Sequence, residues 1–376
     1  MKNLFVNFVG FLIFFMFFNC NSRNTNENTL IQYDVSASYP EKEIALEEIA
    51  DIEYLQLNLD DEFLFTRDPH IVTSQKIIIS HDGDVLIFSR NGEPLSKFNH
   101  KGIGPGEYPF IRELLYDETA DEIFIKLPNT IMVYSSSGEY RRTIPLQGRM
   151  EDFYCQFVNY DSETLLLHHD YSVYSNPFTF ISKKDGSVTD SIMTPKEKEV
   201  NLLALSRDGS FLIPPTYRIV KHRNGYLLTD YSIDTVYLFT QDRKLTLILE
   251  RRPKIQTMDQ VIFLNSFIEA GNYDFVCSVT VKNENGSLPK KYLMRNKKTG
   301  SIYRQKITFS DYQGKSVYLS PETIANTHDS KLGLIILDLG ELSEANNENR
   351  LKGKLKELVD SSEEEGNNIF LLLHFK

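Results

Sequence analysis

Residues 76–98 read KIIISHDGDVLIFSRNGEPLSKF, and this stretch decides the fold class. Two β-rich runs flank a turn at 81–83, and a second turn at Asn91-Gly92 leads into 95–98, where apolar and polar residues alternate. Asn-Gly between two such runs is the strongest short-range signal for a β-hairpin, because both turn positions tolerate a positive φ. Alternation is expected of a strand with one face in water. The stretch therefore predicts short antiparallel strands joined by tight turns.

The same unit recurs four more times along the chain. Its last turn returns at a fairly regular spacing, at these positions: Gly92, Gly138, Gly186, Asp242 and Gly300. A period of roughly 40–50 residues with three or four strands per unit is typical of a β-propeller blade, and the longer later gaps imply inserted loops. A large β-sandwich or a pair of β-domains is the alternative. Neither accounts for a hairpin that returns at near-constant spacing with the same turn chemistry.

Two β-rich segments, 49–59 and 368–375, remain at the two ends of the chain. Strands from the two ends commonly close a propeller by completing one blade, so we predict six blades. The last segment is too apolar to be a free tail, and we expect it to pair beside the strand near 54–57. An apolar stripe at i, i+4, i+7 and i+8 predicts a helix over 349–360, packed over the edge or bottom of the ring. The stripe consists of Leu351, Leu355, Leu358 and Val359.

The predicted fold is thus all-β, a single six-bladed β-propeller over 31–376 with a short C-terminal helix and a closing strand. The 41% hydrophobic and 25% charged content fits a folded soluble protein. Lys and Arg total 41 against 52 Asp and Glu, a formal net charge of −11. An acidic surface repels phosphates, so we expect no nucleic-acid partner.

The first twenty residues predict export. Lys2 precedes an apolar stretch over 4–18 that ends at Cys20, and a polar run follows. The stretch is short for a membrane-spanning helix, which needs about 20 residues. The pattern resembles a bacterial lipoprotein signal, with 1–19 removed as a signal peptide, Cys20 carrying the lipid and 20–30 forming a flexible tether.

The resemblance of this leader to a lipoprotein signal is incomplete. Phe17 and Asn19 stand where the usual pattern has Leu and a small residue. An uncleaved anchor and ordinary secretion are therefore the alternatives to lipid attachment at Cys20.

A glycine-rich stretch follows the first unit directly. It contains Gly102, Gly104, Pro105, Gly106, Glu107 and Tyr108. This G-x-G-P-G-E-Y stretch resembles one carried by six-bladed β-propeller lipoproteins of Bacteroidetes, an NHL-like family of largely unknown function. The segments 234–237 (DTVY) and 297–300 (KKTG) resemble other elements of that family. The resemblance implies a lipid-anchored protein of the cell envelope, expected at the outer membrane on either its periplasmic or its surface face.

Candidate chemistry is sparse. The glycine-rich stretch lacks the Lys and Ser/Thr of a phosphate loop, so we interpret it as a crossover between blades, with Glu107 bonding backbone N–H groups. In His168-His169-Asp170, adjacent side chains of a strand point to opposite faces. That leaves His168 and Asp170 on one face, fewer than the three ligands of a catalytic zinc site. We therefore predict no metal ligand and no catalytic residue.

The other two cysteines, Cys155 and Cys277, are interpreted as buried thiols, with a disulfide as the alternative. We expect a membrane-tethered, non-catalytic binding or scaffold module whose ligand and cofactor are unknown. An envelope protein or a glycan is the candidate partner. The alternative is an NHL-like propeller enzyme, a lactonase, lyase or glycan-cleaving hydrolase, with a metal at the central channel. Fold alone does not decide between the two classes.

Overall fold

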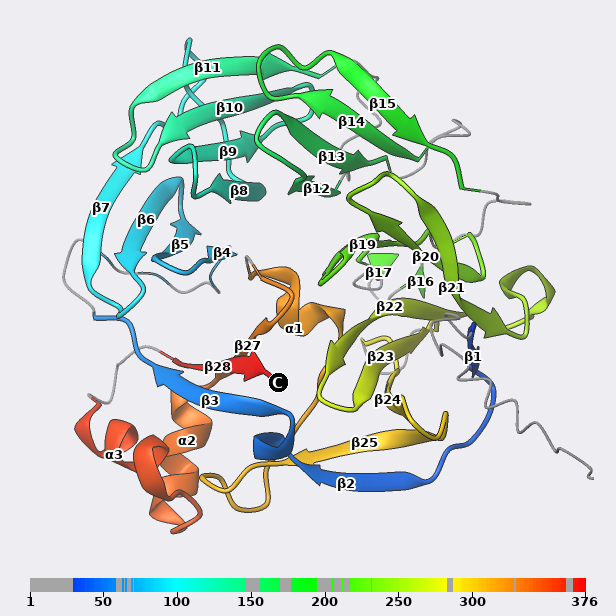
Figure 1. The fold of residues 1–376 in the computed structure, drawn as a ribbon. Helices are drawn as coiled ribbons and strands as arrows, with labels where there is room; N and C mark the ends of the chain where they lie inside the picture. The colour runs from blue at the N-terminus through cyan, green and yellow to red at the C-terminus, as the bar shows by residue number, and fades with distance from the viewer. Residues whose placement is uncertain are drawn as a thin grey trace, which may run out of the picture.

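A computed structural model gives the fold of the protein. It describes residues 30–58, 63, 65, 69, 71–146, 156–169, 177–194, 204–205, 211–212, 217–230, 232–282, 287–327, 329–362 and 368–376. These residues form six β-sheets that stand as blades around a common axis (Figure 1). The predicted six-bladed β-propeller is confirmed.

Blades 1 to 3 are regular four-stranded antiparallel sheets, each built from one continuous stretch of chain. Blade 1 contains β4 (Ile71–Val72), β5 (Lys76–His81), β6 (Asp84–Ser89) and β7 (Pro94–Asn99). Blade 2 contains β8 (Glu113–Asp117), β9 (Glu122–Lys126), β10 (Thr130–Ser135) and β11 (Tyr140–Pro145). Blade 3 contains β12 (Gln156–Asn159), β13 (Thr164–His168), β14 (Phe178–Ser182) and β15 (Val188–Ile192).

Blades 4 and 5 each gain an outer strand from the N-terminal segment. Blade 4 contains β18 (Ile219–His222), β19 (Gly225–Leu228), β20 (Thr235–Thr240) and β21 (Leu245–Arg252), and β1 (Ile31–Asp34) pairs in parallel with β21. Blade 5 contains β22 (Ile262–Ala270), β23 (Tyr273–Thr280), β24 (Lys290–Asn296) and β25 (Ile302–Thr308), and β2 (Glu41–Ala45) pairs in parallel with β25. The short β26 (Ser316–Val317) also pairs with β25. A separate two-stranded sheet joins β16 (Ala204–Leu205) and β17 (Phe211–Leu212).

Blade 6 closes the ring with strands from both ends of the chain. Its order is β27 (Leu332–Leu337), β28 (Ile369–Phe375) and β3 (Ala50–Leu55). The register places Phe370 opposite Leu55 and Leu371 opposite Tyr54. The C-terminal segment therefore pairs where the sequence predicted, because a short apolar strand is stable only when both of its edges and faces are covered.

The C-terminal helical region differs from the prediction. The expected helix over 349–360 is α3 (Gly353–Ser361), and Leu351 lies before it, in a β-bridge with Tyr312. A second helix, α2 (Leu339–Asn347), precedes it and was not predicted. Both helices lie outside β3 at the rim of the ring (Figure 1). The apolar stripe on α3 still faces inward, since Leu355 and Val359 belong to the core of this side of the ring.

A third helix, α1 (Pro321–Ala325), lies toward the axis of the ring (Figure 1). In blades 1 to 5 the first strand is the one nearest the axis, whereas blade 6 has only three strands. The helix directly precedes β27 and takes the place that an innermost strand has in the other blades. Short 3₁₀ turns complete the described helices, η1 (Leu46–Glu48) and η3 (Ile255–Thr257).

Apolar side chains pack between neighbouring blades. One cluster joins blades 1 and 2, a second joins blades 2 and 3, a third joins blades 3 and 4, and a fourth joins blades 6 and 1. The largest cluster unites blades 4, 5 and 6 with the N-terminal strands and the helices. At Gly138, where φ is +86°, an added Cβ would lie 2.5 Å from the Cβ of Phe98 in blade 1. This turn therefore requires glycine both for its backbone conformation and for the approach of the neighbouring blade.

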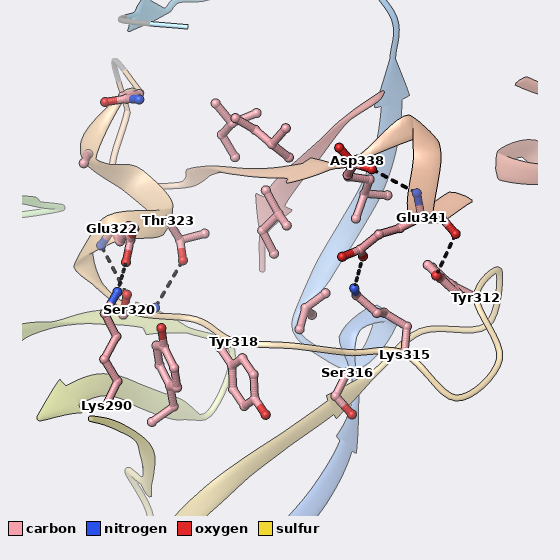
Figure 2. Close-up of a pocket in the computed structure, with 18 of the residues that line it drawn as sticks. Lys290, Tyr312, Lys315, Ser316, Tyr318, Ser320, Glu322, Thr323, Asp338 and Glu341 are labelled. Atoms are coloured by element: carbon pink, nitrogen blue, oxygen red, sulfur yellow. Dashed lines mark hydrogen bonds and ion pairs between the residues drawn. The ribbon is translucent and has the colours of Figure 1, made fainter. Parts of the chain in front are cut away.

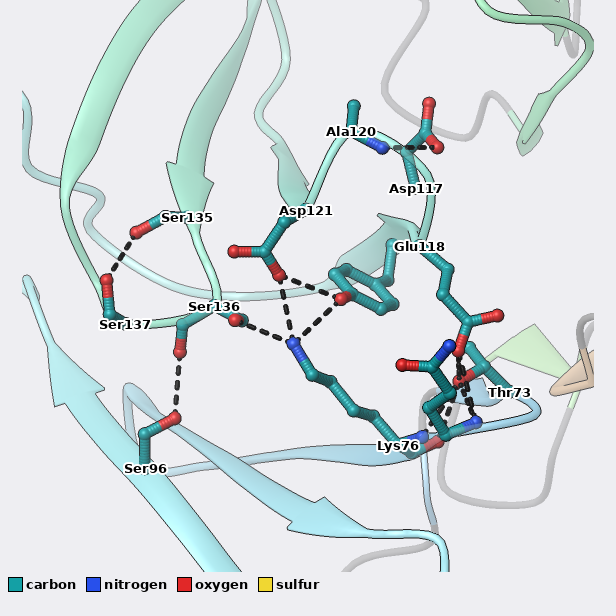
Figure 3. A network of polar contacts seen from close by, with 12 residues as sticks. Thr73, Lys76, Ser96, Asp117, Glu118, Ala120, Asp121, Ser135, Ser136 and Ser137 are labelled. Carbon is teal, nitrogen blue, oxygen red and sulfur yellow. Dashed lines mark hydrogen bonds and ion pairs between the residues drawn. The ribbon is translucent and has the colours of Figure 1, made fainter.

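Polar side chains also form hydrogen bonds between neighbouring blades (Figure 3). Lys76 of blade 1 donates to Tyr116 Oη (2.9 Å), Asp121 Oδ1 (3.0 Å) and Ser136 Oγ (2.8 Å) of blade 2. Burial acts to raise the pKa of Asp121, but the hydrogen bonds from Ser136, Lys76 and Tyr116 outweigh it and lower that pKa to about 2. Glu118 Oε1 accepts a hydrogen bond from the Thr73 hydroxyl at 2.7 Å, which is a second contact between the same two blades.

Several predictions fall on residues outside the described ones. They include the signal peptide over 1–19, Cys20, all of the tether except residue 30, Cys155 and Asp170. Cys277 is described, and it is a buried free thiol. Within the described part of the chain, no helix has the length and apolar character needed to cross a membrane.

Candidate functional site

The glycine-rich stretch connects the last strand of blade 1 to the first strand of blade 2. The Gly104 N–H donates to Glu107 Oε2 at 2.8 Å. The Tyr108 hydroxyl donates to Gly83 O (2.7 Å) and accepts the His100 N–H (3.1 Å). A Cβ at Gly102 would lie only 2.0 Å from Glu107 Oε2, so the carboxylate occupies the inside of the loop. This geometry attaches the stretch to blade 1 and places a carboxylate where a phosphate loop would need N–H groups.

Of the remaining members of this stretch, Pro105 is exposed and Gly106 contacts blade 2. Pro105 precedes Gly106, whose φ is +75° and whose carbonyl accepts the Tyr134 hydroxyl of blade 2 at 2.8 Å. The side chain of Ile103 is 97% exposed at the tip. The stretch thus contributes contacts between blades rather than a cavity.

His168 lies in a buried pair that the sequence did not reveal. Its Nε2 is 3.0 Å from Asp230 Oδ2, and both side chains are almost fully buried between blades 3 and 4. Burial acts to raise the pKa of Asp230, but the hydrogen bond and charge of His168 lower it to about 2. Among the described residues, no three His, Cys, Asp or Glu side chains are grouped so that they could hold a metal ion.

The central channel, the default site in a propeller, contains a pocket of about 380 Å³. The first strands of blades 2, 3 and 4 line it together with α1. Gln156 ties two of these strands, because its Oε1 accepts the N–H groups of Arg218 (2.9 Å) and Ile219 (3.1 Å). Lys221 also lines the channel, and burial lowers the pKa of its ammonium group. Ile324 of α1 lines the same pocket, so the helix narrows the channel from the side of blade 6.

A larger pocket, of about 660 Å³, lies between blades 5 and 6 (Figure 2). We call it the blade 5–6 pocket. The segment 315–323 and β24 form one side, the first turn of α2 forms the opposite side, and β27 contributes an apolar strip through residues 334–337. Sequence reasoning missed this site because its residues share no motif and come from separate segments between 217 and 342.

Two ion pairs stand on opposite sides of the blade 5–6 pocket (Figure 2). Lys290 Nζ lies 3.3 Å from Glu322 Oε2, and Lys315 Nζ bonds Glu341 Oε2. Burial acts to lower the pKa of Lys290, but Glu322 and Tyr292 outweigh it and raise that pKa above its usual value. Lys290 is therefore a cation at neutral pH, and each of the two lysines contacts a carboxylate.

Caps at two helix starts orient further polar groups of this pocket. Ser320 caps α1 by accepting the Glu322 N–H at 3.3 Å, and its own N–H donates to Thr323 Oγ1 at 3.1 Å. Asp338 caps α2 by accepting the Glu341 N–H at 2.9 Å. Both caps satisfy N–H groups that a helix leaves without partners. The two glutamates of the ion pairs are thus held on capped first turns.

Tyrosine rings supply flat surfaces. Tyr318 is 49% exposed and stacks on Tyr292, with ring centroids 4.4 Å apart and planes 16° from parallel. Tyr312 is buried beneath Lys315, and its hydroxyl reaches Glu341 O at 3.5 Å. Tyr217 is the fourth tyrosine that lines this pocket, and burial raises the pKa of its phenol. A half-exposed ring held flat by a second ring is a preorganised contact surface.

The comparisons with known proteins agree with this architecture. Residues 30–374 match the family described as "Domain of unknown function (DUF4934)". The chain belongs to this family. A search of the curated proteins finds no match to this DUF4934 protein.

A solved structure shares the fold of this DUF4934 protein. A crystal structure named "Putative exported protein" from Bacteroides fragilis is 16% identical with a TM-score of 0.64, and the match covers 93% of this chain and 100% of that chain. A member of the duf4221 family from Bacteroides vulgatus is 12% identical with a TM-score of 0.47, covering 87% and 97%. At such identities the first likeness establishes the fold alone. The predicted NHL-like relationship stays a prediction.

Proposed function

We propose that the protein is a non-catalytic binding module of the bacterial cell envelope and that the blade 5–6 pocket takes its ligand. One observation carries the proposal: the pocket has the size of a small-molecule site, and its polar groups are already oriented by ion pairs and helix caps. Pockets of roughly 300–1,000 Å³ with a few fixed polar groups on an apolar base are typical ligand sites. Preorganisation reduces the entropy lost on binding.

The protonation states around this pocket favour binding over catalysis. A general acid or base works best when its pKa lies near the operating pH. Here the pKa of Lys290 is raised, and burial raises the pKa of the Tyr292 phenol and that of the Cys277 thiol, the latter to about 12. At neutral pH these groups are an ammonium ion, a phenol and a thiol, and each is far from titrating.

A screen of small fragments by protein-observed NMR tests the pocket. Ser316→Trp places a large ring among residues that line it, whereas Ser187→Trp, in a turn of blade 3, is the matched control. We expect fragments to bind the wild type and the control but not Ser316→Trp. Fragments that bind all three proteins equally, or none of them, would refute the proposed site.

The proposal of a membrane anchor rests on the first twenty residues of the sequence. Lys2, the apolar run over 4–18 and Cys20 support lipid attachment, and the "Putative exported protein" with the same fold is consistent with export. Two or more acyl chains are needed for stable anchoring, since one chain binds a bilayer only marginally. We propose the outer membrane as the location, with its periplasmic or surface face as the two cases.

Cell fractionation tests the anchor. Cys20→Ser should move the protein from the membrane fraction to the soluble fraction and abolish incorporation of labelled fatty acid, while Cys155→Ser should change neither. Retention of Cys20→Ser in the membrane would show that the apolar leader stays uncleaved.

The enzyme alternative places a metal at the central channel. Stoichiometric calcium or zinc in the purified protein would favour it over the binding module.

A further inference from the structure

The chemistry of the blade 5–6 pocket narrows its ligand. The exposed face of Tyr318 is a flat, weakly polar surface, and the neighbouring strip of β27 includes the half-buried Ile335. A ligand that covers these groups needs an apolar face of its own. A purely apolar ligand, however, would bury the polar groups on both sides without giving them partners, which costs free energy.

The two ion pairs specify what the edges of the ligand must carry. At Lys290 and Glu322, an ammonium donor and a carboxylate acceptor lie 3.3 Å apart, and Lys315 and Glu341 present the same combination on the facing side. A hydroxyl group donates one hydrogen bond and accepts others. Neighbouring hydroxyls on a ring can therefore donate to the carboxylate and accept from the ammonium without breaking the pair, and such charge-assisted bonds are the stronger kind.

The same ion pairs disfavour charged ligands. An anion would have to compete with Glu322 or Glu341 for a lysine, and it would approach a chain whose formal net charge is −11. A cation would have to compete with a lysine for its glutamate. The third carboxylate, Asp338, already accepts the N–H that caps α2. Both lysines and both glutamates are thus paired within the protein, and Asp338 is hydrogen-bonded at the start of a helix, so a neutral ligand has the smallest desolvation cost.

We infer that the ligand is a neutral saccharide whose ring stacks on Tyr318 while its hydroxyls bond the two lysine–glutamate pairs; this deepens the proposed binding function and rests on it. A pyranose combines an apolar face of C–H groups with a rim of hydroxyls, which is the combination the pocket requires. The pocket volume of about 660 Å³ also fits. A cavity of that order accommodates a ligand of drug-like size, about two or three sugar rings.

Titration calorimetry with defined oligosaccharides tests the inference. The probes are neutral gluco-, manno-, galacto- and xylo-oligosaccharides of two to six units, with uronate-containing and sulfated oligosaccharides as the charged set. The variants are Tyr318→Ala, which removes the stacking ring, and Tyr318→Phe, which keeps it. Tyr140→Ala is the matched control, because Tyr140 is similarly exposed, at 43%, but lies on blade 2.

We expect at least one neutral oligosaccharide to bind the wild type and no charged one to bind better. Affinity should fall at least tenfold in Tyr318→Ala and stay within about threefold of wild type in Tyr318→Phe and Tyr140→Ala. Circular dichroism of Tyr318→Ala separates a lost contact from a lost fold. A preference for charged saccharides, or binding that Tyr318→Ala leaves unchanged, overturns the inference.

The outcome also separates the inference from the function on which it rests. If no saccharide binds but fragments still occupy the pocket in a manner blocked by Ser316→Trp, the saccharide assignment fails and the binding site stands. If neither saccharides nor fragments occupy the pocket, both fail, and an envelope protein recognised elsewhere on the ring becomes the candidate partner.

Discussion

Removing the closing strand should unfold the whole domain. β28 is the middle strand of blade 6, with β27 on one edge and β3 on the other. Deletion of 368–376 therefore leaves two edges unpaired, and it removes a set of apolar side chains that are almost fully buried. These are Ile369, Phe370, Leu371, Leu372, Leu373 and Phe375.

The magnitude follows from this burial. Each such side chain contributes about 1.5–3 kcal/mol when fully buried, so the six contribute about 9–18 kcal/mol. Typical domains are stable by only about 5–15 kcal/mol in total. The residues belong to two clusters, one of which reaches blade 1 and the other blades 4 and 5, so the loss extends well beyond blade 6.

Urea denaturation followed by far-UV circular dichroism is the suitable assay, because the chain contains no Trp. The truncated protein should show no cooperative transition and should aggregate in size-exclusion chromatography. Leu372→Ala is the graded version and should lower the free energy of unfolding by about 2–5 kcal/mol. His374 is an exposed position near the end of the same strand, and His374→Ala should change that free energy by less than about 1 kcal/mol. A truncated protein with the full-length melting temperature and solubility would refute the closure argument.

Three further predictions concern other contacts. Lys76→Met removes the hydrogen bonds that Lys76 makes between blades 1 and 2. In the same denaturation assay it should cost about 1 kcal/mol of unfolding free energy or somewhat more, whereas Lys354→Met, at an exposed helix position, should leave the unfolding midpoint unchanged. The folded pKa of Asp121 is about 2, below its usual 3.8, so its stabilising contribution is present above about pH 4 and lost as the pH falls toward about 2. Asp121→Asn should flatten the measured stability over that interval, and an unchanged pH profile would exclude this role. In a Cys155→Ser background, Cys277 should react with a thiol reagent only on unfolding, because its thiol is buried and its pKa is raised.

The blades could be predicted from the sequence because their determinants are local. Each hairpin is encoded by residues next to one another, as in the strands on either side of Asn91 and Gly92, where φ of the glycine is +91°. The pairing of 368–375 with the strand near residue 54 was predictable for a different reason. When a ring of repeats closes, the apolar segments at the two chain ends are left with unpaired strand edges, and they can cover these edges by pairing with each other.

The helices were less predictable. The stripe from Leu351 to Val359 indicated one helix, but Leu351 pairs with Tyr312 instead, because tertiary contacts override a weak local preference at a helix end. The helix α2 carries only three buried apolar residues, Leu339, Leu342 and Ala345, too few for a clear amphipathic signal.

The sequence by itself thus determined the fold class, the repeat and the closure of the ring. Only the tertiary structure decided the parallel pairing of β1 with β21 and of β2 with β25, the placement of α1 beside the axis, and the blade 5–6 pocket. The physical reason is separation along the chain. Ile31 pairs with Leu249 of a distant strand, and Tyr292 stacks on Tyr318 from a segment that follows the next strands of the same blade, and no local periodicity records such contacts.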